Sequence, residues 1–244
     1  MMAGPVCTPY RVLDRTLIID LGGRRKILSS APQGGGLCVA SHILNHQVAD
    51  NPAVPTDFPR RLGDPARCLK NVAAKYGLKA ATVGLMTAVP MTQLVTARCA
   101  AASLWVECFA TVGVSNAVRA GEWENMQIAR DFGRDPVKPG TINLIVVTNV
   151  SLPNAALVGA VQVATEAKTG VLVEAGVLSC ESGSFATGTG TDAVVIACRL
   201  RGEGRFCRYS GTHTVLGALI GQAVTRCVSV GLDKAKHWFE KDLR

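Results

Sequence analysis

Residues 185–198, FATGTGTDAVVIAC, place hydroxyl groups, a carboxylate and flexible backbone immediately before an apolar run. Gly188 and Gly190 permit positive φ and the close approach of a ligand to backbone N–H groups. The side chains that could act as nucleophile, proton acceptor or ligand donor are those of Thr187, Thr189, Thr191 and Asp192. A bulge or Asx-turn that only starts a strand would need the same residue types. The segment alone leaves both interpretations open.

The same segment superficially matches the GxGxxA fingerprint of dinucleotide-binding sites. That fingerprint must follow a strand and open a helix, so that the helix N-terminus can hold a pyrophosphate. Here the glycines precede the apolar strand predicted at 193–198, and no helix follows them. The phosphate-loop pattern GxxxxGK[ST] is also absent from the chain. A glycine-loop nucleotide site is therefore the less favoured alternative.

Two other residues have side chains suited to proton transfer, His213 and Glu166. His213 stands just before an apolar helix that Thr212 or Thr214 could cap, and a helix N-terminus favours the neutral, basic form of histidine near pH 7. An exposed histidine in the capping region is the alternative. Glu166 and Lys168 interrupt an otherwise apolar helical segment, so each faces either solvent or a buried site.

Metal and anion sites have weaker signals. His42 and His46 are four residues apart, a spacing that suits metal binding on a helix, but no carboxylate or cysteine set accompanies them, which favours a surface helix. The nine cysteines are scattered with no CxxC pair, so neither a disulfide framework nor a zinc site is expected. Gly35 and Gly36 belong to a triple-glycine loop that could bind an anion or backbone, or merely connect two elements. We expect no metal and no cofactor.

The elements that must position these residues alternate between strand and helix. The pattern predicts a hairpin at 16–31, turning at Gly22-Gly23, and helices at 37–48, 65–76, 91–102, 154–176 and 215–231. Apolar strands are predicted at 80–90, 104–118, 141–153 and 193–198. This order indicates an α/β fold with a mixed sheet packed with helices, in a single domain spanning 1–244. The proline-rich stretch 51–65 is predicted to be irregular, and residues 232–244 to form a charged tail.

A strand–helix–strand unit occurs twice, at 80–121 and 141–198. Residues 109–118 and 185–194 align without gaps, with five identical positions, which suggests an internal duplication. Chance similarity between short apolar segments is the alternative. The polar GTGTD sequence is present only in the second copy.

Composition and charge limit the function classes. The formal net charge is +8, but the basic residues are dispersed and not interleaved with aromatics, so a solvated surface is favoured over nucleic-acid binding. No uninterrupted apolar run reaches the roughly 18 residues of a membrane span, and the N-terminus does not match a signal peptide. A cytoplasmic protein without nucleic-acid or membrane partners is expected.

Eight segments taken in order carry a resemblance to a known family. They are SSAPQGGG (29–36), ILN (43–45), GLMTA (84–88), VGVSNAVRAG (112–121), GTINLIVV (140–147), TEAKTGVL (165–172), ATGTGTDAVVIAC (186–198) and YSGTHTVLGALIG (209–221). The chain resembles the adenosylcobinamide amidohydrolase (CbiZ) family over residues 25–230. The resemblance implies hydrolysis of the amide that joins the corrin propionate to aminopropanol, with adenosylcobyric acid as the other product. A non-catalytic corrinoid carrier is the alternative.

An amide hydrolase needs a nucleophile or activated water, a base and donors for the oxyanion. His213 is the candidate base, Glu166 or Asp192 could orient it or help to activate water, and Thr187 or Thr189 could be the nucleophile. The Gly188–Gly190 turn is the candidate oxyanion hole. A corrin carries a fringe of amides, and the candidate side chains for binding it are those of Asn45, Asn116 and Asn143. The oligomeric state is left open.

Overall fold

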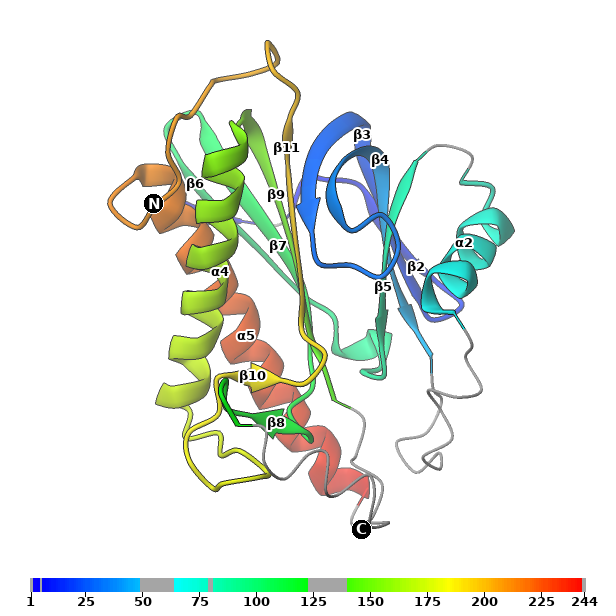
Figure 1. Ribbon diagram of the computed structural model, residues 1–244, viewed down its shortest axis with the longest axis vertical. Coiled ribbons are helices and arrows are strands. Elements are labelled where there is room, and N and C mark those ends of the chain that lie inside the picture. The colour runs from blue at the N-terminus through cyan, green and yellow to red at the C-terminus, as the bar shows by residue number, and fades with distance from the viewer. Residues whose placement is uncertain (1, 5, 49–63, 79–80, 123–139, 243–244) are drawn as a thin grey trace.

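The computed structural model describes residues 2–4, 6–48, 64–78, 81–122 and 140–242, and it is a mixed α/β protein (Figure 1). Within these residues, three helices pack on one large sheet of nine strands, and two short strands pair beside it. The helices are α2 (Pro65–Lys75), α4 (Asn154–Glu174) and α5 (Val215–Asp242), with a 3-10 turn, η1 (Met91–Gln93). The large sheet comprises β1 (Met2–Gly4), β2 (Tyr10–Leu13), β3 (Thr16–Ser29), β4 (Gly36–Gln47), β5 (Thr82–Thr87), β6 (Val95–Ala101), β7 (Leu104–Val112), β9 (Ile142–Ser151) and β11 (Ala193–Arg199), and the short pair is β8 (Ala117–Val118) with β10 (Gly188–Thr189).

The sheet runs in the order β1-β6-β7-β9-β11-β3-β4-β5, with β2 added to β3. Its central strands β9 and β11 are parallel, as are β4 and β5, while most other neighbours are antiparallel. Because β9 and β11 are parallel, the residues that precede them, Thr141 and Asp192, lie at the same end of the sheet.

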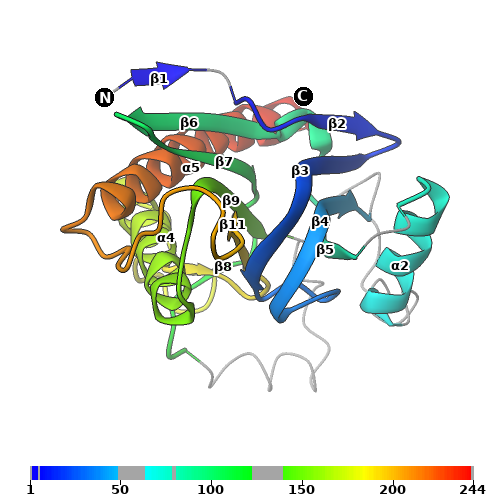
Figure 2. The same cartoon turned by 90° about the horizontal axis from the view of Figure 1, so that it is seen from above.

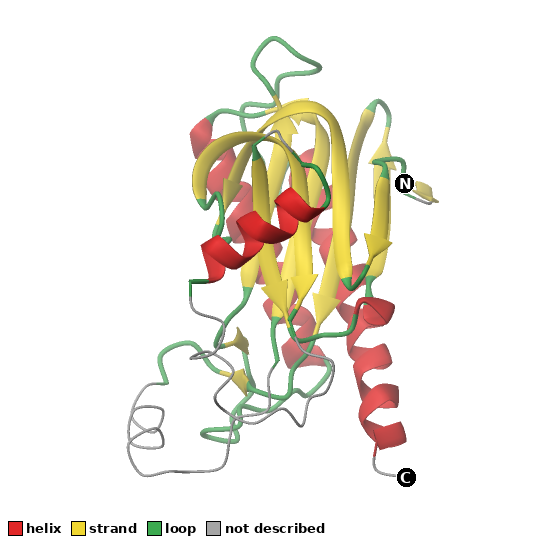
Figure 3. Cartoon of the chain, turned by 90° about the vertical axis from the view of Figure 1, so that its right-hand side faces the viewer, coloured by secondary structure: helices red, strands yellow, loops and turns green. Residues whose placement is uncertain are grey.

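Strand β3 is one bent strand, so the hairpin predicted at 16–31 is wrong. Its pairing with β4 is continuous except for an irregularity between Asp20 and Arg25. Gly22 and Gly23 lie in that irregularity with φ of 65° and 134°, which other residues adopt only with strain. Residues 26–29 of β3 pair with both β11 and β4, whereas residues 16–20 pair with β4, and the bend carries this half away from β11 together with β5 (Figures 2 and 3).

Three apolar clusters define the resulting layers. The first fills the space between helices α4 and α5 and one face of β6, β7, β9 and β11. The second lies between the opposite face of those strands and the β3–β4–β5 half, with Phe109 and Ile145 facing Leu17 and Ile43. The third joins α2 to β4 through Leu69 and Leu44. The order is therefore helices, sheet, sheet, helix (Figure 2).

Two predicted helices are strands. The segment at 37–48 is β4, and the segment at 91–102 is η1 followed by β6. β4 has partners on both sides, β3 and β5, and β6 pairs with β7 and β1. Backbone pairing with these neighbours outweighed the weak helical preference of the two segments.

The other helices follow their sequence signals. The Asp64 side chain accepts a hydrogen bond from the Ala66 N–H at 2.9 Å, capping α2 as predicted, and Gly77 ends that segment with φ of 68°. Thr214 Oγ1 accepts from the Gly217 N–H at 3.0 Å and caps α5. The expected tail at 232–244 instead continues α5 to Asp242, with Leu232 and Ala235 buried.

Helices α4 and α5 are long and apolar enough to span a membrane by length and composition alone. Their buried residues form the first apolar cluster against the sheet, as in the core helices of many globular proteins. Length and hydropathy are therefore weak evidence for a membrane span.

The predicted duplication has a partial structural counterpart. The second unit is β9, α4 and β11, as expected, but the first has β6 where a helix was predicted. Phe109, Ala110 and Thr111 lie inside β7, whereas Phe185, Ala186 and Thr187 precede β10. The duplication and the single-domain organisation stay predictions. The irregular connection predicted at 51–65 lies almost wholly outside the described residues.

Candidate active site

A polar cluster lies between the two halves of the sheet, at the end where β9 and β11 begin. Asn45 on β4, Thr111 on β7 and Asn143 on β9 are at most 1% exposed. Asn143 Nδ2 donates to Asn45 Oδ1 at 3.0 Å and to the Met86 carbonyl at 2.7 Å, and Asn45 Nδ2 donates to Thr111 Oγ1 at 3.1 Å. Buried polar side chains in such a network fix one another's orientation.

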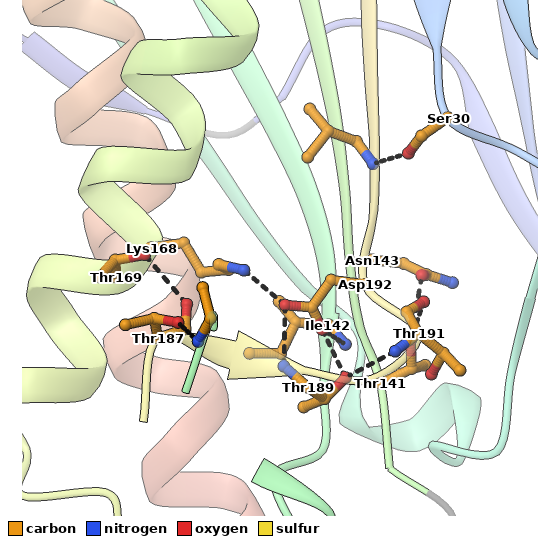
Figure 4. Close-up of polar contacts among 12 residues, drawn as sticks. Ser30, Thr141, Ile142, Asn143, Lys168, Thr169, Thr187, Thr189, Thr191 and Asp192 are labelled. Atoms are coloured by element: carbon orange, nitrogen blue, oxygen red, sulfur yellow. Dashed lines mark hydrogen bonds and ion pairs between the residues drawn. The ribbon is translucent and has the colours of Figure 1, made fainter. Parts of the chain in front are cut away.

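The cluster continues around the β9–β11 pair to a buried ion pair. Lys168 of α4 contacts Asp192, and their side chains are 8% and 14% exposed (Figure 4). Asp192 Oδ1 also accepts from the Ile142 N–H at 2.9 Å and from Thr189 Oγ1 at 2.6 Å, and Oδ2 accepts from the Thr189 N–H at 3.1 Å. Four donors therefore surround this carboxylate, which suits it to holding the turn in place.

The threonine turn 187–191 is fixed at several points. Thr169 Oγ1 of α4 donates to the Thr187 carbonyl at 2.9 Å, and Thr187 Oγ1 accepts from the Ala120 N–H at 2.8 Å. Thr191 Oγ1 donates to the Gly140 carbonyl at 3.1 Å, and Figure 4 shows Thr191 beside the other threonines of the turn. Gly190 and Thr191 are exposed, so the cluster reaches solvent at this turn.

Glycines allow close packing within the cluster. A Cβ on Gly188 would overlap the Asp192 carboxylate and come within 2.7 Å of Lys168 Nζ. A Cβ on Gly140 would collide with Asn116 Oδ1, and it would be 2.9 Å from Ser115 Oγ. Asn116 Oδ1 is buried and has no hydrogen-bond partner among the described residues. It is an acceptor available at the edge of the cluster.

Most of the predicted binding residues therefore come together. The cluster contains or adjoins Asn45, Asn116, Asn143, Thr187, Gly188, Thr189, Gly190, Thr191 and Asp192. The loop of Gly35 and Gly36 borders it from β5, because the backbone of Gln33 pairs with Gly84, two residues before Met86. A Cβ on Gly35 would come within 2.5 Å of the Ala31 carbonyl, so close backbone packing explains that glycine.

His213 and Thr212 lie elsewhere, and the contacts of the described residues do not bring His213 to Asp192. Both are exposed just before α5. Nearby Ser210 donates to the Ala156 carbonyl in the first turn of α4 at 2.6 Å, whereas Lys168 is twelve residues further along that helix. At 1.5 Å per residue this separates the two ends by roughly 18 Å.

Glu166 is also outside the cluster. It is exposed on the outer face of α4, where it lines a shallow depression of about 510 Å³ with Val161, Gln162, Thr165 and Thr169. Its neighbour Lys168, two residues later, points to the opposite face and reaches Asp192. Among the described residues, no hydrogen bond or ion pair connects Glu166 to Asp192.

The two histidines that suggested a metal site lie on a strand and not on a helix. His42 and His46 are both in β4, where residues four apart are separated by about 13 Å, too far for one metal ion. His46 Nδ1 is 2.8 Å from Thr16 Oγ1, and His42 Nδ1 is 3.1 Å from Ser41 Oγ. Burial, with Arg15 and Lys75 nearby, lowers the pKa of His46 below its usual value of 6.5. Among the described residues, no three His, Cys, Asp or Glu side chains are grouped as metal ligands.

Three residues of the cluster were not predicted, Lys168, Thr111 and Thr141. The signal for Lys168 was visible as a charge inside an apolar helix, but the choice between it and Glu166 requires the helix to be oriented. Thr141 is 4% exposed, and its Oγ1 donates to the Thr191 carbonyl at 2.9 Å and lies 3.5 Å from Asn143 Oδ1. A threonine at the start of a strand carries no distinctive sequence signal.

Together, fold and cluster define a layered α/β protein with a polar site of hydroxyl, amide and paired charged groups. Such a site can supply hydrogen bonds to an amide substrate and hydroxyl nucleophiles. The order around Gly188 and Gly190, a turn leading into strand β11, does not match a dinucleotide-binding site, as expected from the sequence.

Comparison with known proteins makes the class specific. The model of the adenosylcobinamide amidohydrolase (CbiZ) family matches residues 8–239. An adenosylcobinamide amidohydrolase of Methanosarcina mazei is 32% identical over 233 residues, which cover 92% of this chain and 97% of that protein. An uncharacterized protein of Methanocaldococcus jannaschii is 32% identical over 232 residues, 90% of this chain and 86% of that protein.

One solved structure shows a looser likeness. A β-aminopeptidase of a Burkholderia species aligns with a TM-score of 0.43 at 12% identity, over 94% of this chain and 82% of that chain. The family model and the Methanosarcina mazei relative show that the chain belongs to the adenosylcobinamide amidohydrolase family and is a hydrolase.

Proposed function

We propose that this protein hydrolyses the amide bond of adenosylcobinamide between the corrin propionate and aminopropanol, giving adenosylcobyric acid. The family match supports the substrate class. The observation that carries the proposal is the cluster in which the buried Lys168–Asp192 pair holds a threonine turn beside Asn143. This arrangement offers fixed donors and hydroxyls to an amide in a site largely withdrawn from water, where hydrogen bonds to a developing oxyanion are most effective.

In this proposal Asp192 is a positioning residue. Its four donors come from Lys168, Ile142 and Thr189, so it fixes the turn and the start of β9 relative to each other. The Thr189 N–H already donates to Asp192, so the N–H groups of Gly188 and Gly190 and the amide of Asn116 are the proposed contacts for the substrate amide. His213 and Glu166 have no part in it, because both lie away from the cluster.

A corrinoid is the proposed partner, and the cytoplasm the proposed location. Adenosylcobinamide is cationic, so the net charge of +8 does not attract it over a distance. Local contacts must therefore provide the affinity. The exposure of Gly190 and Thr191 supports an entry to the cluster at the threonine turn.

The direct test is to incubate the purified full-length protein with adenosylcobinamide and to follow the corrinoid by mass spectrometry. We expect adenosylcobyric acid and aminopropanol in equal amounts. Calorimetry on the same sample measures binding independently. Binding without product would indicate the non-catalytic corrinoid carrier, and a melting temperature raised by ATP or NAD would favour the glycine-loop nucleotide binder; either result would contradict the proposal.

A further inference from the structure

Thr141 is the hydroxyl residue at the centre of the cluster. It lies between the Gly140 peptide and the first residue of β9, and it is 4% exposed. Its Oγ1 contacts the Thr191 carbonyl and Asn143 Oδ1, and its own carbonyl accepts from the Gly113 N–H at 3.0 Å. Contacts from two separate segments, at Thr191 and Gly113, and from Asn143 of its own strand therefore hold this residue in place.

The carbonyl that precedes Thr141 is held just as closely. Thr191 Oγ1 donates to the Gly140 carbonyl oxygen at 3.1 Å, which polarises that peptide bond. A Cβ on Gly140 would collide with Asn116 Oδ1 and lie 2.9 Å from Ser115 Oγ, so this position favours glycine. The Gly140–Thr141 peptide is thus followed by the Thr141 hydroxyl, and its carbonyl oxygen accepts a hydrogen bond from Thr191 Oγ1.

A threonine hydroxyl needs a base before it can attack the amide of a separate substrate molecule. Within the described residues, Asp192 is surrounded by four donors, and Lys168 is paired with it. The hydrogen-bond partners of the Thr141 hydroxyl are instead the Thr191 carbonyl and Asn143 Oδ1. The α-amine of Thr141 itself would be in reach if it were free, and an N-terminal threonine uses its amine in this way.

We propose that the chain cleaves its own Gly140–Thr141 peptide bond and that Thr141 then acts as the N-terminal nucleophile. In the first step Thr141 Oγ1 attacks the Gly140 carbonyl carbon, the C–N bond breaks, and the hydroxyl proton passes to the departing nitrogen. This leaves an ester between Gly140 and the Thr141 side chain. Water then hydrolyses the ester, giving a Gly140 carboxylate, the free hydroxyl and the free α-amine.

The catalytic half of this proposal rests on the proposed amide hydrolysis. The α-amine of Thr141 takes the proton from Oγ1 as the oxygen attacks the corrinoid amide carbonyl. Aminopropanol departs with that proton, and water hydrolyses the resulting ester to the acid. Cleavage also removes the buried Gly140 peptide from the hydroxyl, which gives a substrate access to a residue that is otherwise enclosed.

The test is the intact mass of the purified full-length protein. We expect two fragments, 1–140 and 141–244, whose masses sum to that of the chain plus one water. Thr141→Val should leave a single uncleaved chain, and Thr141→Ser, which keeps a hydroxyl, should still be cleaved. The matched control is Thr148→Val, which removes another buried threonine hydroxyl of β9 that donates to a backbone carbonyl, and it should be cleaved like the parent protein.

Several outcomes would overturn the inference. One is wild-type protein that hydrolyses adenosylcobinamide while its mass remains that of the whole chain. Another is a Thr141→Val protein that is cleaved at 140–141. Because the mass is read without any corrinoid, cleaved protein that does not hydrolyse adenosylcobinamide would count against the proposed function and leave the self-cleavage standing.

Discussion

At the scale of single residues, the buried pair of Lys168 and Asp192 organises the candidate site. Lys168 projects from an apolar helix, and Asp192 precedes a buried strand, so each charge is stabilised chiefly by the other and by nearby donors. Removing one partner from such a pair leaves an uncompensated charge in a poorly solvated place, whereas removing both leaves none.

We predict that Lys168→Met destabilises the protein by about 3–5 kcal/mol, because Asp192 loses its cationic partner. The double variant Lys168→Met/Asp192→Asn should recover at least about 1 kcal/mol of that loss. Denaturant unfolding of the two single variants and the double variant measures the coupling. The control is the exposed pair Asp14–Lys75, which should show no comparable coupling. Strictly additive effects at 168 and 192 would contradict the account.

Some residues of the candidate site could be predicted from the sequence, and others could not. The threonines, Asp192 and the three asparagines stood out because polar side chains beside glycines and apolar strands need a reason to be there. Thr141 did not stand out, and Glu166 was preferred to Lys168. Choosing between two charges on one helix depends on which face packs on the sheet, and this is a property of the tertiary structure.

At the scale of elements, strand β4 shows where local patterns mislead. Its sequence GLCVASHILNHQ has apolar residues that fit a helical stripe, but pairing with β3 and β5 makes it a strand. Strands β5, β9 and β11 and helices α2, α4 and α5 were predictable, because their apolar runs, prolines and caps agree with the final structure. The bend of β3 was signalled only by Gly22-Gly23, which fits a hairpin equally well.

The stability of the folded protein should depend on pH through His46 on β4. Because burial lowers the pKa of His46 from 6.5, the unfolded chain binds a proton that the folded chain does not in the interval between the two values. Stability should therefore be lost as the pH falls below about 6.5 toward the folded pKa. Thermal melts across this range measure the loss, which His46→Gln should reduce. The control His42→Gln keeps His46 and should keep the loss, and equal slopes in both variants would contradict this assignment.

At the scale of the whole molecule, the site is formed only when the two halves of the sheet are stacked. Asn45 and Met86 come from the β4–β5 half, and Asn143 and Thr111 from the β7–β9 half. The sequence predicted an α/β fold with a mixed sheet, which is confirmed, but not the stacking. Contacts between segments about 100 residues apart in the chain have no local signature.

The absence of a metal requirement also stays a prediction for the whole protein. The cluster offers hydroxyl, amide and paired charged groups, which are not a typical ligand set for zinc. Treatment of the active protein with a chelator should change the rate of corrinoid hydrolysis by less than about twofold. Loss of activity that added Zn²⁺ or Mg²⁺ restores would show a metal that this account lacks.

The central claim is that amide hydrolysis takes place at the cluster where β9 and β11 begin, and the most direct test compares two variants in one assay. The kcat/KM for adenosylcobinamide should fall at least about tenfold in Asp192→Asn, because the threonine turn loses its anchor. In His213→Ala it should stay within about twofold of the parent value, because His213 lies at the far end of α4. Circular dichroism confirms that both variants are folded at the assay temperature. An Asp192→Asn protein as active as the parent, with His213→Ala inactive, would contradict the account.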